Sequence, residues 1–301
     1  MSQPVLSRYL DPDILSRVAD RTFEPRGLVV GNLAGAHKSP LAGFAVEFAG
    51  HREYVPGDDP KHIDWRLFFN RDKYFVKQYE LETNFVCHLL LDISASMRYG
   101  ENRQQKLLYA AQLAAVLAYS VVRQNDKVSL GTFDSQLRGF LPPSNSLAQI
   151  LRITEHLDDI ESVEKTDVAE SLSDFAGRFA RREIVIILSD LFCDLQGLEA
   201  AIQRLRFSRH EVLLFQTLHH DELTFPFEGP IRFLGLEVPQ EERVHADDLR
   251  ATYLEGLARF RQEVELLAER NGCEYLLVDT SRNMADLLSD YLDRRGRSRR
   301  V

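Results

Sequence analysis

The chain has 301 residues, of which 44% are hydrophobic and 28% are charged, a composition typical of soluble globular proteins. This length accommodates one large domain and a smaller one. The formal net charge of −9 argues against a general nucleic-acid binder, since such proteins present basic surfaces to phosphate.

Cysteine usage and the start of the chain favour a cytoplasmic protein. The three cysteines, Cys87, Cys193 and Cys273, are odd in number and fit no metal-binding or redox spacing, which indicates a reducing compartment. The first 20 residues carry charges throughout and lack the apolar core of a signal peptide. The most apolar helical stretch, residues 107–122, is shorter than the roughly 18 to 20 residues that a membrane span needs. We therefore expect cytoplasmic localisation and no membrane span.

Residues 1–82 are predicted to form an N-terminal, β-rich segment. Residues 1–24 place apolar side chains at helical spacing, which predicts a short helical lead-in. Over residues 27–79, glycines are spread among short apolar pieces, a pattern that favours short strands and turns over long helices. Residues 75–80 alternate like a half-exposed strand that leads into the next part of the chain.

A buried strand is predicted over residues 86–91, where an apolar run ends at Asp92 and is followed by Ser94 and Ser96. A continuous apolar run bounded by polar residues is typical of a strand that is buried on both faces of a sheet. The carboxyl end of such a strand is where an open α/β sheet binds ligands. Oxygen donors with a single carboxylate suit a small divalent cation such as Mg²⁺. Alternatively, these three side chains cap the following helix.

The remainder of the chain alternates between predicted strands and helices. Further strands are expected over residues 127–133, 137–141, 184–189, 211–218 and 274–278. Helices are expected over residues 104–124, 146–157, 168–181, 198–207, 247–271 and 284–292, and a small hairpin over 222–242. This alternation predicts a doubly wound, mostly parallel six-stranded α/β sheet over residues 83–293. The arginine-rich tail, residues 294–301, is predicted to be disordered.

The spacing Asp92-x-Ser94-x-Ser96 resembles the metal-ion-dependent adhesion site of von Willebrand factor type A domains. The resemblance implies that a threonine and an aspartate from later loops complete the site. Asp190, at the end of a second long buried run, and Thr166, just before an amphipathic helix, match these two positions. Thr166 is alternatively a cap of that helix.

The same resemblance implies a fold and a mode of action. The six strands would lie in the order 3-2-1-4-5-6, with the short third strand antiparallel. A Mg²⁺ ion, or Mn²⁺ or Ca²⁺ in its place, would bridge the domain to a carboxylate of a partner protein. Ser94 and Ser96 would bind the ion directly, Asp92 directly or through water, and Asp190 through a metal-bound water.

A second resemblance covers the N-terminal part of the chain. Its signature consists of Gly43-x-x-x-Glu47-Phe48, Arg52-x-Tyr54-x-x-Gly57-Asp58, Ile63-Asp64-Trp65-Arg66 and Glu80. These patterns are similar to those of the family known as domain of unknown function 58, with one departure at Lys61, where the family has arginine. Members are commonly associated with MoxR-type AAA+ ATPases. The resemblance therefore implies an adaptor in such a chaperone system.

Two polar clusters each allow two interpretations. The first cluster consists of Arg52, Asp58, Asp64, Trp65 and Arg66. It is either an internal network of ion pairs and turns or a partner-binding patch. The second cluster consists of His219, His220, Asp221 and Glu222, and it is either a metal site or a polar strand edge. Adjacent histidines on an extended chain point in opposite directions, which favours the polar edge.

The sequence favours an interaction module over an enzyme. The competing class is a Mg²⁺-dependent phosphatase with Asp92 as the nucleophile. Enzymes of that kind need a second aspartate two positions on, where this chain has Ser94. The chain also lacks a phosphate-cradling Walker loop and a Gly-x-Ser-x-Gly elbow. We therefore expect a non-enzymatic, metal-dependent protein-interaction module.

Overall fold

The computed structural model describes residues 5–26, 34–38, 47–55, 60, 63–71, 73–80, 82–83, 85–160, 171–172, 174–175, 177–179, 182–236 and 241–297. The chain divides into two compact units. One comprises Pro25–Phe85, and the other comprises Met1–Glu24 together with Val86–Val301. The first 24 residues therefore belong to the unit of the large sheet, which corrects the prediction that they form part of an N-terminal segment ending at residue 82.

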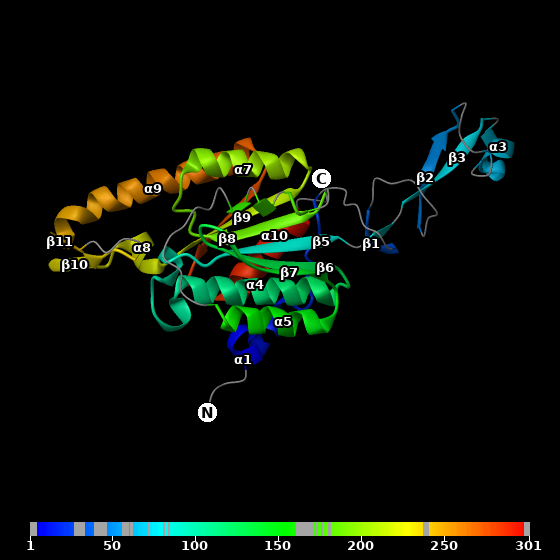
Figure 1. Ribbon diagram of the computed structural model, residues 1–301. Helices are drawn as coiled ribbons and strands as arrows, with labels where there is room; N and C mark the ends of the chain where they lie inside the picture. The colour runs from blue at the N-terminus through cyan, green and yellow to red at the C-terminus, as the bar shows by residue number, and fades with distance from the viewer. Residues whose placement is uncertain are drawn as a thin grey trace. The chain divides into compact units, whose positions relative to one another are not determined.

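A six-stranded sheet forms the centre of the larger unit (Figure 1). Its strands are β5 (Val86–Asp92), β6 (Lys127–Phe133), β7 (Leu137–Ser144), β8 (Ile184–Ser189), β9 (Glu211–Leu218) and β12 (Glu274–Asp279). They lie in the order β12-β9-β8-β5-β6-β7, and all neighbours are parallel except β7, which runs antiparallel to β6. Counted from β5, this is the expected order 3-2-1-4-5-6. The predicted fold class is confirmed.

Helices connect the strands and cover both faces of the sheet. After β5 they are η2 (Ser96–Arg98), η3 (Asn102–Gln104), α4 (Lys106–Arg123), α5 (Leu147–Asp158), α7 (Leu195–Phe207), α8 (His220–Thr224), α9 (Ala246–Arg270) and α10 (Met284–Arg297). In Figure 1, α7 and α9 lie above the sheet, and α4 and α5 lie below it. The expected hairpin is formed by β10 (Pro230–Leu234) and β11 (Glu241–His245) just before α9. Within the described residues, none of these helices is long and apolar enough to cross a membrane.

The central strands are buried because apolar side chains on both faces pack against helices. Every residue of β8 is buried, and so are all residues of β5 after Val86. Successive side chains of a strand point to opposite faces. On the face that α7 and α9 cover, Leu90 of β5 and Ile187 of β8 pack with Leu198 and Leu267. This double coverage is why these strands read as continuous apolar runs in the sequence.

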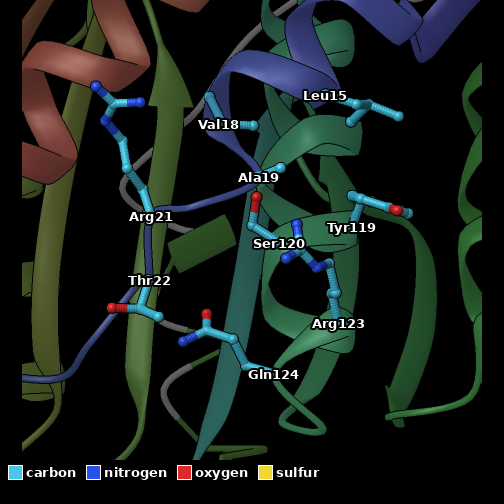
Figure 2. A pocket seen from close by; sticks show the side chains of 9 residues that line it. All are labelled: Leu15, Val18, Ala19, Arg21, Thr22, Tyr119, Ser120, Arg123 and Gln124. Carbon is cyan, nitrogen blue, oxygen red and sulfur yellow. The ribbon is translucent and has the colours of Figure 1, made fainter.

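The N-terminal lead-in consists of two short helices, α1 (Val5–Tyr9) and α2 (Pro12–Val18), that pack against helices of the larger unit. Val18 and Phe23 are buried there. The backbone N–H of Phe23 donates to the Gln124 side chain over 3.1 Å. A small cavity of about 110 Å³ is lined by side chains from α2, from the residues after it and from the end of α4. Figure 2 shows these side chains. The helical character of the lead-in agrees with the prediction, and its packing explains why it belongs to this unit.

The smaller unit, residues 25–85, is β-rich as predicted. Its elements are β1 (Ala34–Lys38), β2 (Glu47–Glu53), α3 (Trp65–Arg71), β3 (Phe75–Glu80) and β4 (Glu82–Thr83). β2 pairs antiparallel with β3, and β1 pairs antiparallel with β4. The short strands and the short helix α3, within the described residues of this unit, agree with the glycine-rich pattern of the sequence.

Asp64, in the signature of this segment, has a structural role. Its Oδ1 accepts the backbone N–H of Arg66 over 3.0 Å and that of Leu67 over 3.4 Å, which caps α3. Its Oδ2 lies 2.9 Å from Nε2 of His51. Trp65, in contrast, is 53% exposed. The internal-network interpretation therefore holds for Asp64, while other signature residues lie outside the described residues, namely Gly43, Gly57, Asp58 and Lys61.

The C-terminal helix extends into the predicted tail. α10 runs to Arg297, and Arg295 is only 3% exposed. The Arg295 guanidinium pairs with Glu211 and Glu274, and its Nε donates to the Glu24 carbonyl over 2.7 Å. The planar guanidinium presents several donors in fixed directions, which suits three acceptors at once. The prediction of a disordered tail is therefore wrong for residues 294–297.

We expect Arg295→Ala to lower the free energy of unfolding by about 3–5 kcal/mol, because it leaves Glu211 and Glu274 without their buried partner. Urea denaturation followed by circular dichroism measures the change. Arg294→Ala removes an exposed arginine from the same helix and is the matched control, with an expected change within about 0.5 kcal/mol. Equal stabilities of the two variants would contradict this role of Arg295.

Candidate metal centre

The two candidate carboxylates lie at the carboxyl ends of adjacent central strands. Asp92 is the last residue of β5, and Asp190 directly follows β8. The two strands are parallel, with Leu91 in register with Leu188, so both carboxylates reach the same edge of the sheet. This is the edge at which α/β sheets bind ligands.

Hydrogen bonds fix the loop that follows β5. Oδ1 of Asp92 accepts the Ser94 N–H over 2.9 Å, and Oδ2 accepts the Ser189 hydroxyl over 2.5 Å. The Ser94 Oγ lies 3.0 Å from the Ser96 Oγ. The loop thus brings one carboxylate and two hydroxyls together. Thr166, the remaining predicted ligand, lies outside the described residues.

The alternative role of these side chains as helix caps does not occur. The helices that follow the loop are η2, η3 and α4, and all three are described over their whole length. Their N-cap residues are Ala95, Glu101 and Gln105, and none makes a side-chain capping hydrogen bond. Asp92 bonds to the Ser94 N–H of the loop and to the Ser189 hydroxyl of β8 instead.

A buried lysine that was absent from the predicted site neutralises part of its charge. Lys106 is 0% exposed, and its Nζ donates to Asp190 Oδ2 over 2.8 Å and to Glu222 Oε1 over 2.9 Å. Burial lowers the pKa of Lys106, but the charges of Asp190 and Glu222 outweigh burial and raise this pKa above its ordinary value. Lys106 is therefore an ammonium ion that joins the end of β8 to α8.

The sequence contains a pattern from which the burial of Lys106 could have been predicted. It contains no such pattern for the participation of Glu222. Buried residues of α4 recur at helical spacing through Ala110, Leu113 and Leu117, and position 106 extends this stripe by one turn. A lysine on the inward stripe of a helix needs a buried partner. The approach of Glu222 depends on the packing of α8, which no local pattern specifies.

Asp92 has no ion-pair partner among the described residues; its contacts are hydrogen bonds from neutral groups. Burial and the nearby charge of Asp190 raise the pKa of Asp92 to about 7, against the lowering effect of its hydrogen bonds. When ionised, Asp92, Asp190 and Glu222 carry three negative charges, and Lys106 carries one positive charge. Two negative charges therefore remain at this edge of the sheet.

The donor set fits Mg²⁺. Octahedral coordination at roughly 2.1 Å places neighbouring ligand oxygens about 3.0 Å apart. The Ser94 and Ser96 hydroxyl oxygens have a separation of 3.0 Å. Hydroxyl and carboxylate oxygens are also the hard ligands that this ion prefers. In the part of the chain that the structure describes, no group of three or more His, Cys, Asp or Glu side chains could hold a metal ion.

The polar cluster at the end of β9 forms the start of α8. His219 Nδ1 accepts the Asp221 N–H over 3.1 Å, and the Glu222 side chain accepts the His219 N–H over 2.7 Å, which makes a reciprocal capping box. His220 Nδ1 lies 3.1 Å from an oxygen of Asp279 in β12. The two histidines thus face different partners, as the polar-edge interpretation expects.

A buried serine, histidine and glutamate near the amino ends of these strands have the spacing of a nucleophilic relay. His88 Nδ1 lies 2.6 Å from Ser129 Oγ, and Nε2 lies 2.9 Å from Glu183 Oε2. However, Ser129 is 0% exposed, and the His88 ring stacks on Phe179 with centroids 3.7 Å apart. These residues lie toward the amino ends of the strands, opposite the edge at which α/β sheets bind ligands. This group satisfies polar atoms inside the core.

Comparisons with known proteins complete this picture. Residues 50–263 match the family model described as "Protein of unknown function DUF58". An uncharacterized protein of Mycobacterium tuberculosis is 21% identical over 290 residues, which cover 95% of this chain and 91% of that protein.

Two solved structures are also similar. An aerotolerance-related membrane protein from Bacteroides fragilis is 20% identical with a TM-score of 0.47, and the match covers 70% of this chain and 100% of that one. The SpRpn10 VWA domain is 12% identical with a TM-score of 0.40, and the match covers 69% of this chain and 95% of that one. Because the family model spans well over half of the sequence, this chain belongs to the DUF58 family.

Proposed function

We propose that this chain is a non-enzymatic protein-interaction module that captures its partner through a divalent cation. The ligands are Asp92, Ser94 and Ser96, with Asp190 beside them and Thr166 as a further ligand from a later loop. The observation that supports this most strongly is the buried Asp92 carboxylate, which lies beside two hydroxyls and lacks a cationic partner among the described residues. A buried charge is costly unless a counterion neutralises it.

Each residue has a definite task in this proposal. Asp92 supplies the charge that attracts the cation. Ser94 and Ser96 supply neutral oxygens, so that much of the positive charge is left for an incoming acid. Bound there, the cation supplies an electrophilic position for a carboxylate of the partner protein. Lys106 engages Asp190, which leaves Asp190 to orient a water rather than to neutralise the ion.

The partner that we propose is a MoxR-type AAA+ ATPase or its client protein, in the cytoplasm. Support for the ATPase comes from family membership together with the signature of residues 63–66. Mg²⁺ is the ion that the hydroxyl-rich donor set favours, and Mn²⁺ and Ca²⁺ share its preference for oxygen.

Two purified proteins test this proposal. The full chain is immobilised and mixed with the MoxR-type ATPase of the same organism, either in Mg²⁺ or in a chelator. We expect capture in Mg²⁺ and release on chelation. A parallel Mn²⁺ titration, followed by electron paramagnetic resonance, reports ion binding without any partner. Absence of Mn²⁺ binding would overturn the metal centre, whereas ion binding without capture would overturn only the choice of partner.

A further inference from the structure

An apolar groove of about 450 Å³ lies beside the candidate metal centre. Ser96 of the metal-binding loop is one of its lining residues. The other walls come from the ends of α8 and α9, from β10 and from the residues that follow β10, and they include Phe227, Phe233, Leu236 and Tyr253. We call this feature the aromatic groove. Clefts of this size and character are typical binding sites.

Contacts beneath the aromatic groove fix its shape. Phe225 is 1% exposed, and its ring lies 5.2 Å from that of Phe227 and 5.0 Å from that of Tyr253. Phe225 has a φ of 48°, the left-handed conformation in which α8 ends, and its backbone N–H donates to the Asp221 carbonyl. Arg250 donates to the carbonyl oxygens of Phe225 and Phe227. The groove is therefore formed before any partner arrives.

The charges around the aromatic groove define what it accepts. Glu222 lines the groove, but its charge is matched by the ammonium of Lys106. Asp221, whose side chain is 37% exposed, is the other acid on the lining. Leu236, at 51% exposed, presents apolar surface to solvent. The middle of the groove therefore favours an apolar side chain, and a basic residue suits the position beside Asp221.

We propose that the aromatic groove binds an aromatic or large aliphatic side chain of an extended partner segment whose acidic residue occupies the metal centre. This inference rests on the proposed function, since the acid needs the cation. Ser96 belongs to both sites, and an extended chain advances about 3.3 Å per residue. The apolar residue therefore lies close to the acid along the partner segment. The metal centre supplies charge recognition, and the groove supplies sequence specificity.

Random peptides displayed on phage test this inference with the full chain as bait. Selection is carried out in Mg²⁺, and bound phage are eluted with a chelator. Three variants are screened beside the original chain. Leu236→Glu places a charge in the groove, Leu147→Glu places the same charge on a 68% exposed leucine of α5, and Asp92→Asn disables the metal centre.

We expect the original chain and the Leu147→Glu variant to enrich peptides with an acid and a nearby aromatic or aliphatic residue. Such peptides should bind the Leu236→Glu variant about tenfold more weakly, with Mn²⁺ affinity unchanged. Peptides with an acid but no apolar preference would overturn the groove and leave the metal centre standing. Enrichment that persists in chelator, or in the Asp92→Asn variant, would overturn the coupling of the two sites. Concentration-dependent dimers that Leu236→Glu abolishes would assign the groove to a second copy and overturn the inference.

Discussion

Asp92→Asn is expected to weaken Mn²⁺ binding on the order of 100-fold, because it removes the carboxylate of the loop while it keeps the size of the side chain. The asparagine oxygen still accepts the Ser94 N–H, and its amide lies beside the Ser189 hydroxyl. Loss of a buried charge also removes a desolvation penalty, so the midpoint of unfolding in chelator should not fall. Isothermal titration calorimetry with Mn²⁺ measures the affinity.

Asp286→Asn is the matched control for this variant. Asp286 lies on α10, where its exposed side chain pairs with Arg17. The substitution removes the same charge from the surface, and Mn²⁺ affinity should stay within about twofold of the original. Equal Mn²⁺ affinities in the two variants would show that the loop after β5 does not bind the ion.

Lys106→Met is expected to lower the stability of the fold strongly and to raise its affinity for the ion. It leaves Asp190 and Glu222 buried without their shared cation, which should lower the free energy of unfolding in chelator by about 3–5 kcal/mol. It also leaves the centre with one more uncompensated negative charge, so Mn²⁺ affinity should rise at least about tenfold. Denaturation with and without Mn²⁺ measures both effects, since bound ion stabilises the folded chain.

A second substitution keeps this test interpretable. Glu222→Gln added to Lys106→Met removes one of the two orphaned charges, and part of the lost stability should return in chelator. The non-additive difference between the single and double variants measures the coupling of the pair. Loss of Mn²⁺ affinity in Lys106→Met, instead of a gain, would mean that Lys106 supports the ion by positioning rather than by charge.

The strands were predictable because local composition determines them. β6, β8 and β9 have the predicted bounds. β8 and β9 are apolar stretches that polar residues bound, and β6 alternates in the manner of a strand. The strand order could not be predicted from local sequence patterns. It was predicted from the resemblance to von Willebrand factor type A domains. Helix starts were harder. α7 begins at Leu195, three residues early, because Asp194 caps it through the backbone N–H groups of Gln196 and Gly197.

The residues of the candidate site that lie at strand ends could be predicted from the sequence. The residues that come together only through contacts between distant parts of the chain could not. Asp92 and Asp190 each end a buried run, so their approach follows from two adjacent parallel strands. Glu222 and Lys106 are 116 residues apart in the chain, and only the fold brings them together. Arg295 shows the same limit. A run of arginines at a chain end indicates a solvated tail. Arg295 is buried instead, and the two glutamates that pair with it come from β9 and β12.

Anomalous diffraction from crystals soaked in Mn²⁺ tests the metal centre most directly. We expect one anomalous peak at roughly 2.1–2.2 Å from the Ser94 and Ser96 hydroxyl oxygens, with the Asp92 carboxylate on the same ion or one water away. Lys106 should remain paired with Asp190 and Glu222. A fully soaked crystal with no peak at this loop, or with the Lys106 ammonium moved onto Asp92 in its place, would contradict the proposed centre.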